Sequence, residues 1–324
     1  MKRRFATQLI AAGLLGMAAG QPFAQSGWPT RPIRLIVPTP PGSSSDIFAR
    51  LIADELAKKL GQAIVVENKP GANGRIGTAA TLAAAPDGQT LLLSFGSAIV
   101  GARVLFPKDK SDATKLQPIS RFGSQGAILA VSADVPVRNI KEFAAWVKAS
   151  REPVNYASYG VGSGGHIVME ALLKSLGIQA NHVPYKDSNL ILSDMRSGLV
   201  KVAALDAVTP IPYLKQHQIH GIGVNGRFRL PETPDIPTLA EQGLPIYMES
   251  WYGIFAPRGI PRAIVDRINA EVGTITASPA MMERFKLMNL TSTPPISPEE
   301  FDKFIHSEIK VWGDVVAASN IHLD

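Results

Sequence analysis

The 324-residue sequence has 45% hydrophobic residues, no cysteine, and 33 Lys and Arg against 27 Asp and Glu. The net charge of +6, with no run of basic residues, is too slight to predict binding to nucleic acid. Without cysteine, thiolate nucleophiles, thiolate metal ligands and disulfides are excluded, so the fold depends on its core, which a chain of this length can bury.

Residues 1–24 have the pattern of a secretory signal peptide. A basic start (Met1–Arg4) precedes an apolar run (Leu9–Ala19) that is too short to span a bilayer, and small residues follow at Gly20 and Ala24. We expect cleavage after Ala24, with Gly20 as the second choice, and a mature protein in the periplasm. A buried N-terminal helix is the competing interpretation.

Strand and helix patterns alternate along the rest of the chain. Apolar runs bounded by turn residues predict strands, and apolar residues at helical spacing predict helices. In chain order we expect strand 34–37, helix 46–60, strand 63–67, helix 74–85, strands 90–94 and 127–132, helix 140–150, strand 155–158, helix 166–176, strand 182–185, helix 188–197, strands 200–205 and 221–224, and helices 264–277 and 298–318. This alternation predicts an α/β fold with parallel sheets, whose ligands bind at the C-terminal ends of the strands.

A Pro-Gly-Ser loop follows the first strand and leads directly into the first helix. Gly42 permits a sharp turn, Ser43 can cap the helix, and Asp46 lies three residues further on, as in a capping box. One Ser is enough for a cap, so Ser43, Ser44 and Ser45 together suggest a ligand that accepts hydrogen bonds. Unpaired N–H groups at a helix N-terminus favour an anion. A well-capped helix without a ligand is the alternative.

A second strand–loop–helix junction, residues 158–166, has the spacing G-x-G-x-x-G from Gly160 to Gly165. This spacing is typical of dinucleotide-binding loops, but we reject that interpretation. The preceding strand is polar, no acidic residue ends the following strand, and an exported chain is not expected to use nicotinamide cofactors. The small residues leave N–H groups exposed for an anion, and His166 could donate to a ligand. A flexible turn is the alternative.

Asp206 follows the strand predicted at 200–205, where its carboxylate could bind a ligand amine, orient a water or cap the turn at Thr209. The histidines show no H-E-x-x-H spacing, and there is no G-x-S-x-G motif. Neither an activated nucleophile nor a pair of carboxylates is evident. We therefore predict a binding protein and not an enzyme. The competing hypotheses are an exported hydrolase that acts on a small acid, and a receptor that senses a ligand but takes no part in its transport.

Short motifs at residues 28–38, 40–47, 66–72, 85–88, 155–158, 182–186, 234–238 and 251–257 cover almost the whole mature sequence. In this order they resemble the Bug-type (TctC-like) periplasmic receptors of tripartite tricarboxylate transporters. The sequence also departs from the usual family pattern. Ser43–Ser45 replace Gly-Gly-Thr, Gly164 and Gly165 replace Ser-Ser before the histidine, Asp187 replaces a glycine after Tyr185-Lys186, and Val100-Gly101 replace Asn-Pro.

The resemblance implies a two-lobed periplasmic-binding-protein fold of type II (Venus flytrap), joined by two crossover strands for which we expect residues 122–130 and 221–227. We assign residues 25–124 and 226–324 to lobe 1 and residues 125–225 to lobe 2. A monomer would capture a small carboxylate-bearing acid without a cofactor or metal, and would pass it to membrane transporter subunits in a transient contact. The predicted ligand-binding residues are Thr39, Gly42, Ser43, Ser44, Asp46 and Ser97 on lobe 1, and Ser158, Gly160, Gly162, Ser163, Gly164, His166 and Asp206 on lobe 2.

Overall fold

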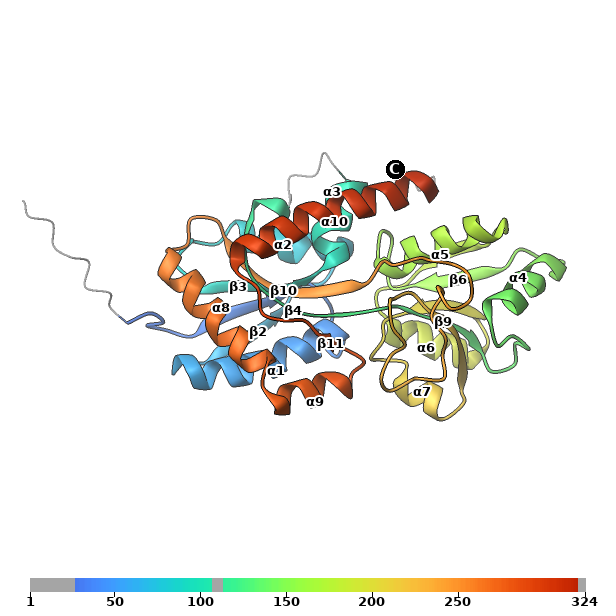
Figure 1. Cartoon of the computed structure of the whole chain (residues 1–324), viewed down its shortest axis with the longest axis horizontal. Helices are drawn as coiled ribbons and strands as arrows, with labels where there is room; N and C mark the ends of the chain where they lie inside the picture. The colour runs from blue at the N-terminus through green and yellow to red at the C-terminus, as the bar shows by residue number, and fades with distance from the viewer. Residues whose placement is uncertain (1–26, 107–112, 320–324) are drawn as a thin grey trace, which may run out of the picture.

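The chain folds into two lobes, each built on one β-sheet with helices packed on its faces (Figure 1). The computed structural model describes residues 27–106 and 113–319. The predicted signal peptide lies outside the described residues. Within those ranges, no helix combines the length and the apolar character needed to cross a bilayer.

The first lobe contains a six-stranded sheet with the order β11-β4-β10-β3-β1-β2. Its parallel strands are β1 (Ile33–Val37), β2 (Ile64–Asn68) and β3 (Thr90–Phe95). Its antiparallel strands are β4 (Leu116–Gln125), β10 (Ser250–Pro257) and β11 (Thr291–Ser292). The helices of this lobe are α1 (Ser44–Leu60), α2 (Arg75–Leu82), α3 (Ala102–Leu105), α8 (Arg262–Thr276), α9 (Pro279–Lys286) and α10 (Pro298–Ser319).

The second lobe contains a five-stranded sheet with the order β7-β6-β8-β5-β9. Its strands are β5 (Ile128–Ser132), β6 (Asn155–Ser158), β7 (Asn181–Pro184), β8 (Val202–Leu205) and β9 (Ile219–Val224). Its helices are α4 (Ile140–Ala149), α5 (Gly164–Leu176), α6 (Ser188–Ser197) and α7 (Ile211–Lys215). The loop after β6 therefore lies at the switch point between its parallel neighbours β7 and β8, as the loop after β1 does in the first sheet.

Both sheets are mixed, whereas the sequence pattern predicted parallel sheets. The difference arises where the chain passes between the lobes. β5 and β10 are the first strands after each crossing, so each begins at the cleft and runs away from it. Their neighbours end at the cleft, and the pairing is therefore antiparallel. The sequence analysis did not predict β4 and β10 as strands, although it expected residues 122–130 to cross between the lobes.

The two crossings lie side by side and are tied together by Asn225, which is fully buried. Its side chain accepts a hydrogen bond from the Ala127 N–H and donates one to the Met248 carbonyl. The connection from β9 to β10 is long, and its residues Ile236 and Leu239 pack on the second sheet. The structure therefore places much of residues 226–249 against lobe 2, although the sequence analysis assigned them to lobe 1.

Helix α1 holds the loop that follows β1 in place on the first lobe. Ser43 caps its start, and Gly61 ends it in the left-handed conformation, with φ of 69°. Its apolar face buries Phe48 against Tyr252, with ring centroids 4.9 Å apart, so the helix is fixed on the sheet. Helix α10 lies across the top of this lobe and reaches towards α5 (Figure 1), with Trp312 buried in an apolar cluster that includes residues of both lobes.

Candidate functional site

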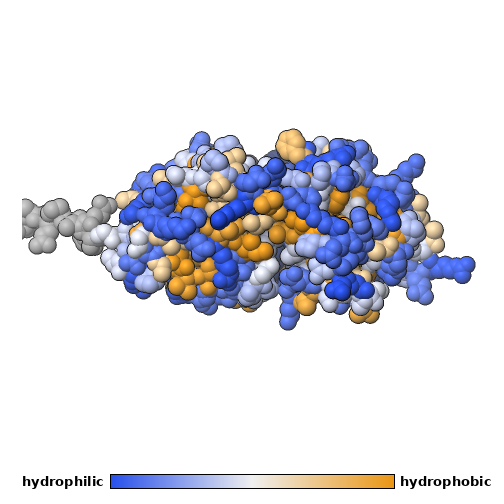
Figure 2. All heavy atoms as spheres, turned by 90° about the horizontal axis from the view of Figure 1, so that it is seen from below, coloured by the Kyte–Doolittle hydropathy of each residue, from blue (hydrophilic) through white to orange (hydrophobic). Residues whose placement is uncertain are grey.

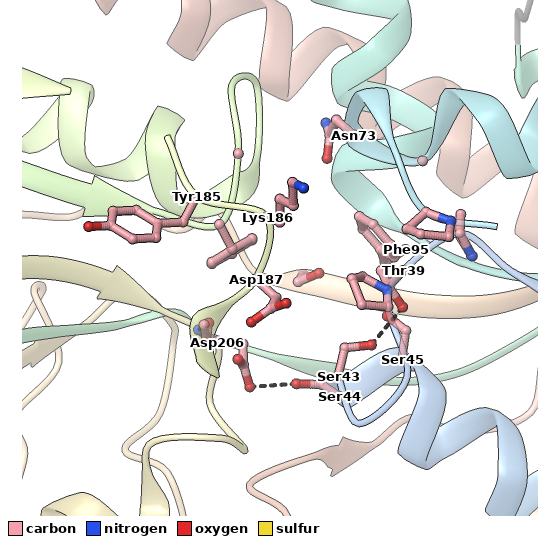
Figure 3. Close-up of a pocket in the computed structure, with 18 of the residues that line it drawn as sticks. Thr39, Ser43, Ser44, Ser45, Asn73, Phe95, Tyr185, Lys186, Asp187 and Asp206 are labelled. Carbon is pink, nitrogen blue, oxygen red and sulfur yellow. Dashed lines mark hydrogen bonds between the residues drawn. The ribbon is translucent and has the colours of Figure 1, made fainter. Parts of the chain in front are cut away.

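A cavity of about 860 Å³ lies between the lobes. It is lined at the C-terminal ends of β1, β2, β3, β6, β7 and β8, which are the parallel strands of both sheets. Figure 3 shows side chains from both lobes facing one another across it. In the view from below, hydrophobic residues gather towards the middle of the molecule, with hydrophilic residues around them (Figure 2). The topology therefore brings loops that are distant in sequence to one site.

On the first lobe, the loop after β1 presents hydroxyl and N–H groups to the cavity. The Ser43 and Thr39 hydroxyl oxygens are 2.6 Å apart, and Ser43 also caps α1. The backbone N–H groups of Ser44 and Ser45 belong to the first turn of the helix and meet no acceptor among the described residues. Both serines line the cavity. This helix terminus therefore has two free donors, and the helix dipole favours an anion there.

Asp46 lies behind this loop and does not line the cavity. Its carboxylate accepts hydrogen bonds from Gly42 N at 2.9 Å, from Asn68 Nδ2 at 2.9 Å and from two nitrogens of Arg50 at 2.9 and 3.0 Å. Burial alone would raise the pKa of Asp46, but these hydrogen bonds, led by that of Arg50, lower it below its usual value. Asp46 and Gly42, whose φ is 78°, therefore fix the shape of the loop.

On the second lobe, the loop after β6 uses most of its N–H groups internally. Gly162 N donates to His166 Nδ1 at 3.1 Å, Ser163 N to the Gly160 carbonyl at 3.1 Å, and Gly165 N to the Tyr159 hydroxyl at 3.0 Å. Ser163 caps α5 through the N–H of His166. A Cβ on Gly165 would lie 2.9 Å from the Tyr159 ring, so the glycine allows this ring to pack on the helix start. Fewer donors face the cavity than the sequence suggested.

Two stacked histidines support this loop from behind. The ring centroids of His166 and His182 are 3.9 Å apart and the ring planes are nearly parallel, and Ser158 Oγ lies 2.7 Å from His182 Nε2. Burial, with a smaller contribution from His182, lowers the pKa of His166 to about 3. Burial lowers the pKa of His182 to about 4. Both rings are therefore neutral at ordinary pH, which agrees with the acceptor role of His166 Nδ1.

Asp206 caps its own turn, as one of its three suggested roles required, and it also lines the cavity. Its Oδ1 accepts hydrogen bonds from Val208 N at 2.8 Å and Thr209 N at 3.0 Å, and Oδ2 accepts one from the Thr209 hydroxyl. Oδ1 also accepts a bond of 2.5 Å from the Ser44 hydroxyl on the other lobe (Figure 3). This contact joins the two loops at one side of the cavity.

Asn73 makes a second bridge between the lobes, which the sequence analysis did not predict. Its Nδ2 donates to the Ser97 carbonyl at 3.1 Å and to the Gly162 carbonyl of the second lobe at 2.9 Å. Asn73 has a left-handed φ of 48°, within a run of positive φ angles from Gly71 to Gly74. The sequence Gly-Ala-Asn-Gly was the available signal, because glycine and asparagine favour this conformation.

The start of α6 is a third strand–loop–helix junction at the cavity. Asp187 caps the helix, and the loop that carries Tyr185, Lys186 and Asp187 lines the cavity between β7 and α6. The Tyr185 hydroxyl donates to Asp194 at 2.7 Å. Burial, with a further contribution from Asp194, raises the pKa of Tyr185 to about 12. The same strand–loop–helix pattern as in the first two junctions could have identified this one in the sequence.

The predicted site residues divide into those at the cavity and those behind it. Thr39, Ser43, Ser44, Gly160 and Asp206 line the cavity. The others shape the surrounding loops or lie beside them: Gly42, Asp46, Ser97, Ser158, Gly162, Ser163, Gly164 and His166. Their roles in binding stay predictions. Among the described residues, no group of three His, Asp or Glu side chains is arranged to hold a metal ion.

Comparison with known proteins adds independent information. Residues 48–321 match the model of a family described as tripartite tricarboxylate transporter family receptor. Protein BugT of Bordetella pertussis (strain Tohama I) is 32% identical over 327 residues, which cover 100% of this chain and 99% of BugT. The structure of MatC from Rhodopseudomonas palustris with bound malate is 30% identical, with a TM-score of 0.83, and covers 89% of this chain and 100% of that one. The R. palustris protein Rpa4515 with adipate is 27% identical, with a TM-score of 0.86, and covers 91% and 99%.

Proposed function

We propose that this chain, which belongs to the tripartite tricarboxylate transporter receptor family, is a periplasmic receptor for a small acid. The acid would bind between the lobes through a carboxylate and would be passed to the membrane subunits of a transporter. The two structural neighbours described above hold malate and adipate, which are both carboxylates. The likeness of the fold over most of the chain supports the same ligand class here.

The observation that carries this proposal is the free helix terminus at the cavity. The N–H groups of Ser44 and Ser45 meet no acceptor among the described residues and lie beside the hydroxyls of Ser43 and Thr39. Hydrogen bonds to a charged group contribute about 1.5–3 kcal/mol each, and a helix terminus adds about 0.3–1 kcal/mol. Several such contacts reach the roughly −8 kcal/mol of micromolar affinity.

The two bridges between the lobes support capture by closure. The Ser44–Asp206 and Asn73–Gly162 hydrogen bonds each join one lobe to the other beside the cavity. The chain crosses between the lobes near Ala127 and again near Met248, where the Asn225 side chain holds the two crossing segments together, and these segments would act as the hinge. A ligand that contacts both lobes stabilises the arrangement in which these bridges form, and this difference shifts the population towards it.

An exported hydrolase is the weaker candidate. The buried His166 and the half-buried His182 are both neutral and stand behind the second loop, away from the cavity lining. Asp206 accepts hydrogen bonds on both oxygens, which leaves it poorly placed to remove a proton. We therefore propose that the protein releases its ligand unchanged, acts as a monomer, and reaches the periplasm after loss of residues 1–24.

Titration calorimetry of the mature protein with malate, adipate and matched monocarboxylates tests this function, with mass spectrometry of the acid after incubation. We expect binding in the micromolar range and full recovery of the unchanged acid. A chemically altered acid would support the hydrolase. No binding of any acid in the panel would refute the receptor. The mass of the exported protein and its elution on size exclusion would test the cleavage site and the monomer.

A further inference from the structure

We propose that Asp187 makes the cavity selective for acids that also carry a protonated amine. The inference rests on the proposed function and deepens it, because it names the second group that the ligand presents. One carboxylate oxygen of Asp187 accepts no hydrogen bond from another described residue, and the acidic and basic side chains around the cavity lie apart. The cavity should therefore bind an acid with an amine more tightly than a diacid of the same length.

Asp187 has one oxygen engaged and one available. Its Oδ1 accepts hydrogen bonds from Asn189 N at 2.8 Å and Leu190 N at 3.1 Å, which caps α6. Its Oδ2 receives no hydrogen bond or ion pair from another described residue, and the residue lines the cavity. Figure 3 shows the carboxylate directed into the space between the lobes, towards the serine loop of the first lobe.

The neighbouring Asp206 makes a plain carboxylate unfavourable in this part of the cavity. Asp206 comes from the same lobe and also lines the cavity, but donors from both lobes occupy its two oxygens. A second carboxylate of a ligand placed here would meet two negative side chains, and like charges at close range disfavour binding. An ammonium group would instead donate to the available oxygen of Asp187 in a charge-assisted hydrogen bond.

Positive charge in the cavity lies elsewhere. Lys186 has no hydrogen bond or ion pair to another described residue, and in Figure 3 its amine points away from Asp187 towards Asn73. The Arg75 guanidinium also lines the cavity, where it lies over the Phe106 ring at 4.2 Å. The lining therefore holds two acidic and two basic side chains, with Lys186 and Asp187 directed apart. An amino-bearing acid matches this separation, with its carboxylate towards the lysine or the serine N–H groups.

The helix cap does not by itself require a charge. Asn and Ser cap helices about as well as Asp, so Asp187→Asn keeps the cap and removes the negative charge. The Asp187→Asn variant therefore separates a role of Asp187 in ligand recognition from its role in capping α6. Asp134→Asn is the matched control, because Asp134 is an exposed acid that pairs with Lys201 on the same lobe and does not line the cavity.

Calorimetry of the mature protein with matched pairs of probes tests the inference: pentanoate and norvaline, glutarate and glutamate, adipate and α-aminoadipate. We expect the amino member of at least one pair to bind about tenfold or more tightly than its partner. This preference should fall to less than about threefold in Asp187→Asn and persist in Asp134→Asn, with thermal midpoints close to that of the unaltered protein. Asp187→Ser, which also supplies a cap, should behave like Asp187→Asn.

The outcomes separate this inference from the function on which it rests. Equal affinity for both members of every pair, or a preference that persists in both Asp187 variants, overturns the role of Asp187 while the receptor function stands. Binding of none of the six acids refutes the receptor and the inference together. Loss of binding in Asp134→Asn as well would show a general charge effect and would also overturn the assignment.

Discussion

The neutral histidine pair predicts that stability falls as the pH falls from about 6.5. The pKa of His166 is about 3 and that of His182 about 4, against an ordinary value of 6.5 in the unfolded chain. In this window the unfolded state binds more protons than the folded state, so the free energy of unfolding decreases with falling pH. The unfolded histidine is half protonated at pH 6.5, so the full slope of about 1.36 kcal/mol per unit is reached only below that pH, and the change between pH 6.5 and pH 5 is about 1.6 kcal/mol for His166. The half-buried His182 adds up to about the same amount. The loss continues towards the folded pKa values and then levels off.

Urea unfolding at half-unit steps from pH 5 to pH 8 measures this dependence. His166→Asn keeps an acceptor near the position of Nδ1 for the Gly162 N–H, and His182→Gln keeps a polar partner for Ser158. Neither replacement titrates in this range. The double variant should be less stable at pH 7.5, because the ring stacking is lost, but its stability should change far less between pH 6.5 and pH 5. His220, whose pKa is also lowered by burial, accounts for a small remaining slope.

Two results would refute this reasoning. One is a free energy of unfolding that stays constant between pH 7.5 and pH 5. The other is a slope in the double variant equal to that of the unaltered protein, since the titrating groups would then lie elsewhere. Asp46 does not confuse the comparison, because hydrogen bonds keep its pKa below the usual value and it stays charged throughout the window.

Three further predictions concern the residues around the cavity. Ser44→Ala removes the hydroxyl bond to Asp206 and should weaken binding of the preferred acid about tenfold in calorimetry, with little change in thermal midpoint; unchanged affinity would exclude this bridge from closure. Asn73→Gly suits the left-handed backbone and removes both hydrogen bonds of the side chain, to Ser97 within the first lobe and to Gly162 of the second lobe, so affinity should fall about threefold to tenfold, whereas equal affinity would make the bridge to Gly162 incidental. Asp46→Asn breaks the charged pairing with Arg50 and should lower the free energy of unfolding by about 1.5–3 kcal/mol. Asp54→Asn, on the same helix, is the control, and an equal loss of stability in both variants would contradict a specific role of the Asp46 carboxylate.

Local patterns in the sequence predicted the two strand–loop–helix junctions after β1 and β6 well. A glycine followed by serine before a helical pattern marks both the turn and the cap, and the structure confirms the predicted cap at Ser43. Ser163, which was predicted as a ligand-binding residue, caps α5 in the same way. The α/β class and the two-lobed fold are also confirmed by the structural neighbours. These features depend on residues within a few positions of one another, which a single sequence displays.

Other features depend on partners that are distant in sequence. Asp46 looked like a ligand residue, but Asn68 lies 22 positions away and completes its hydrogen-bonding network behind the loop. The bridge from Asn73 to Gly162 spans 89 positions and forms only because the two lobes meet. In the second loop, the N–H of Gly162 is occupied by a side chain of the helix that follows it. The spacing of residues in a sequence does not show whether a backbone N–H group is free or donates a hydrogen bond to a side chain.

This division between residues that hold the loops and residues that face the cavity has a testable consequence. Asp46, His166 and His182 act through the backbone, so their replacement should lower stability and affinity together. Asp187 and Lys186 face the cavity with few bonds to the rest of the fold, so their replacement should change affinity or ligand preference with little change in stability. A receptor family can then keep one rigid set of loops and change its ligand through a few side chains. Asp187 lines the cavity with one oxygen that accepts no hydrogen bond from another described residue. A plot of affinity against stability for both sets of variants would separate the two groups.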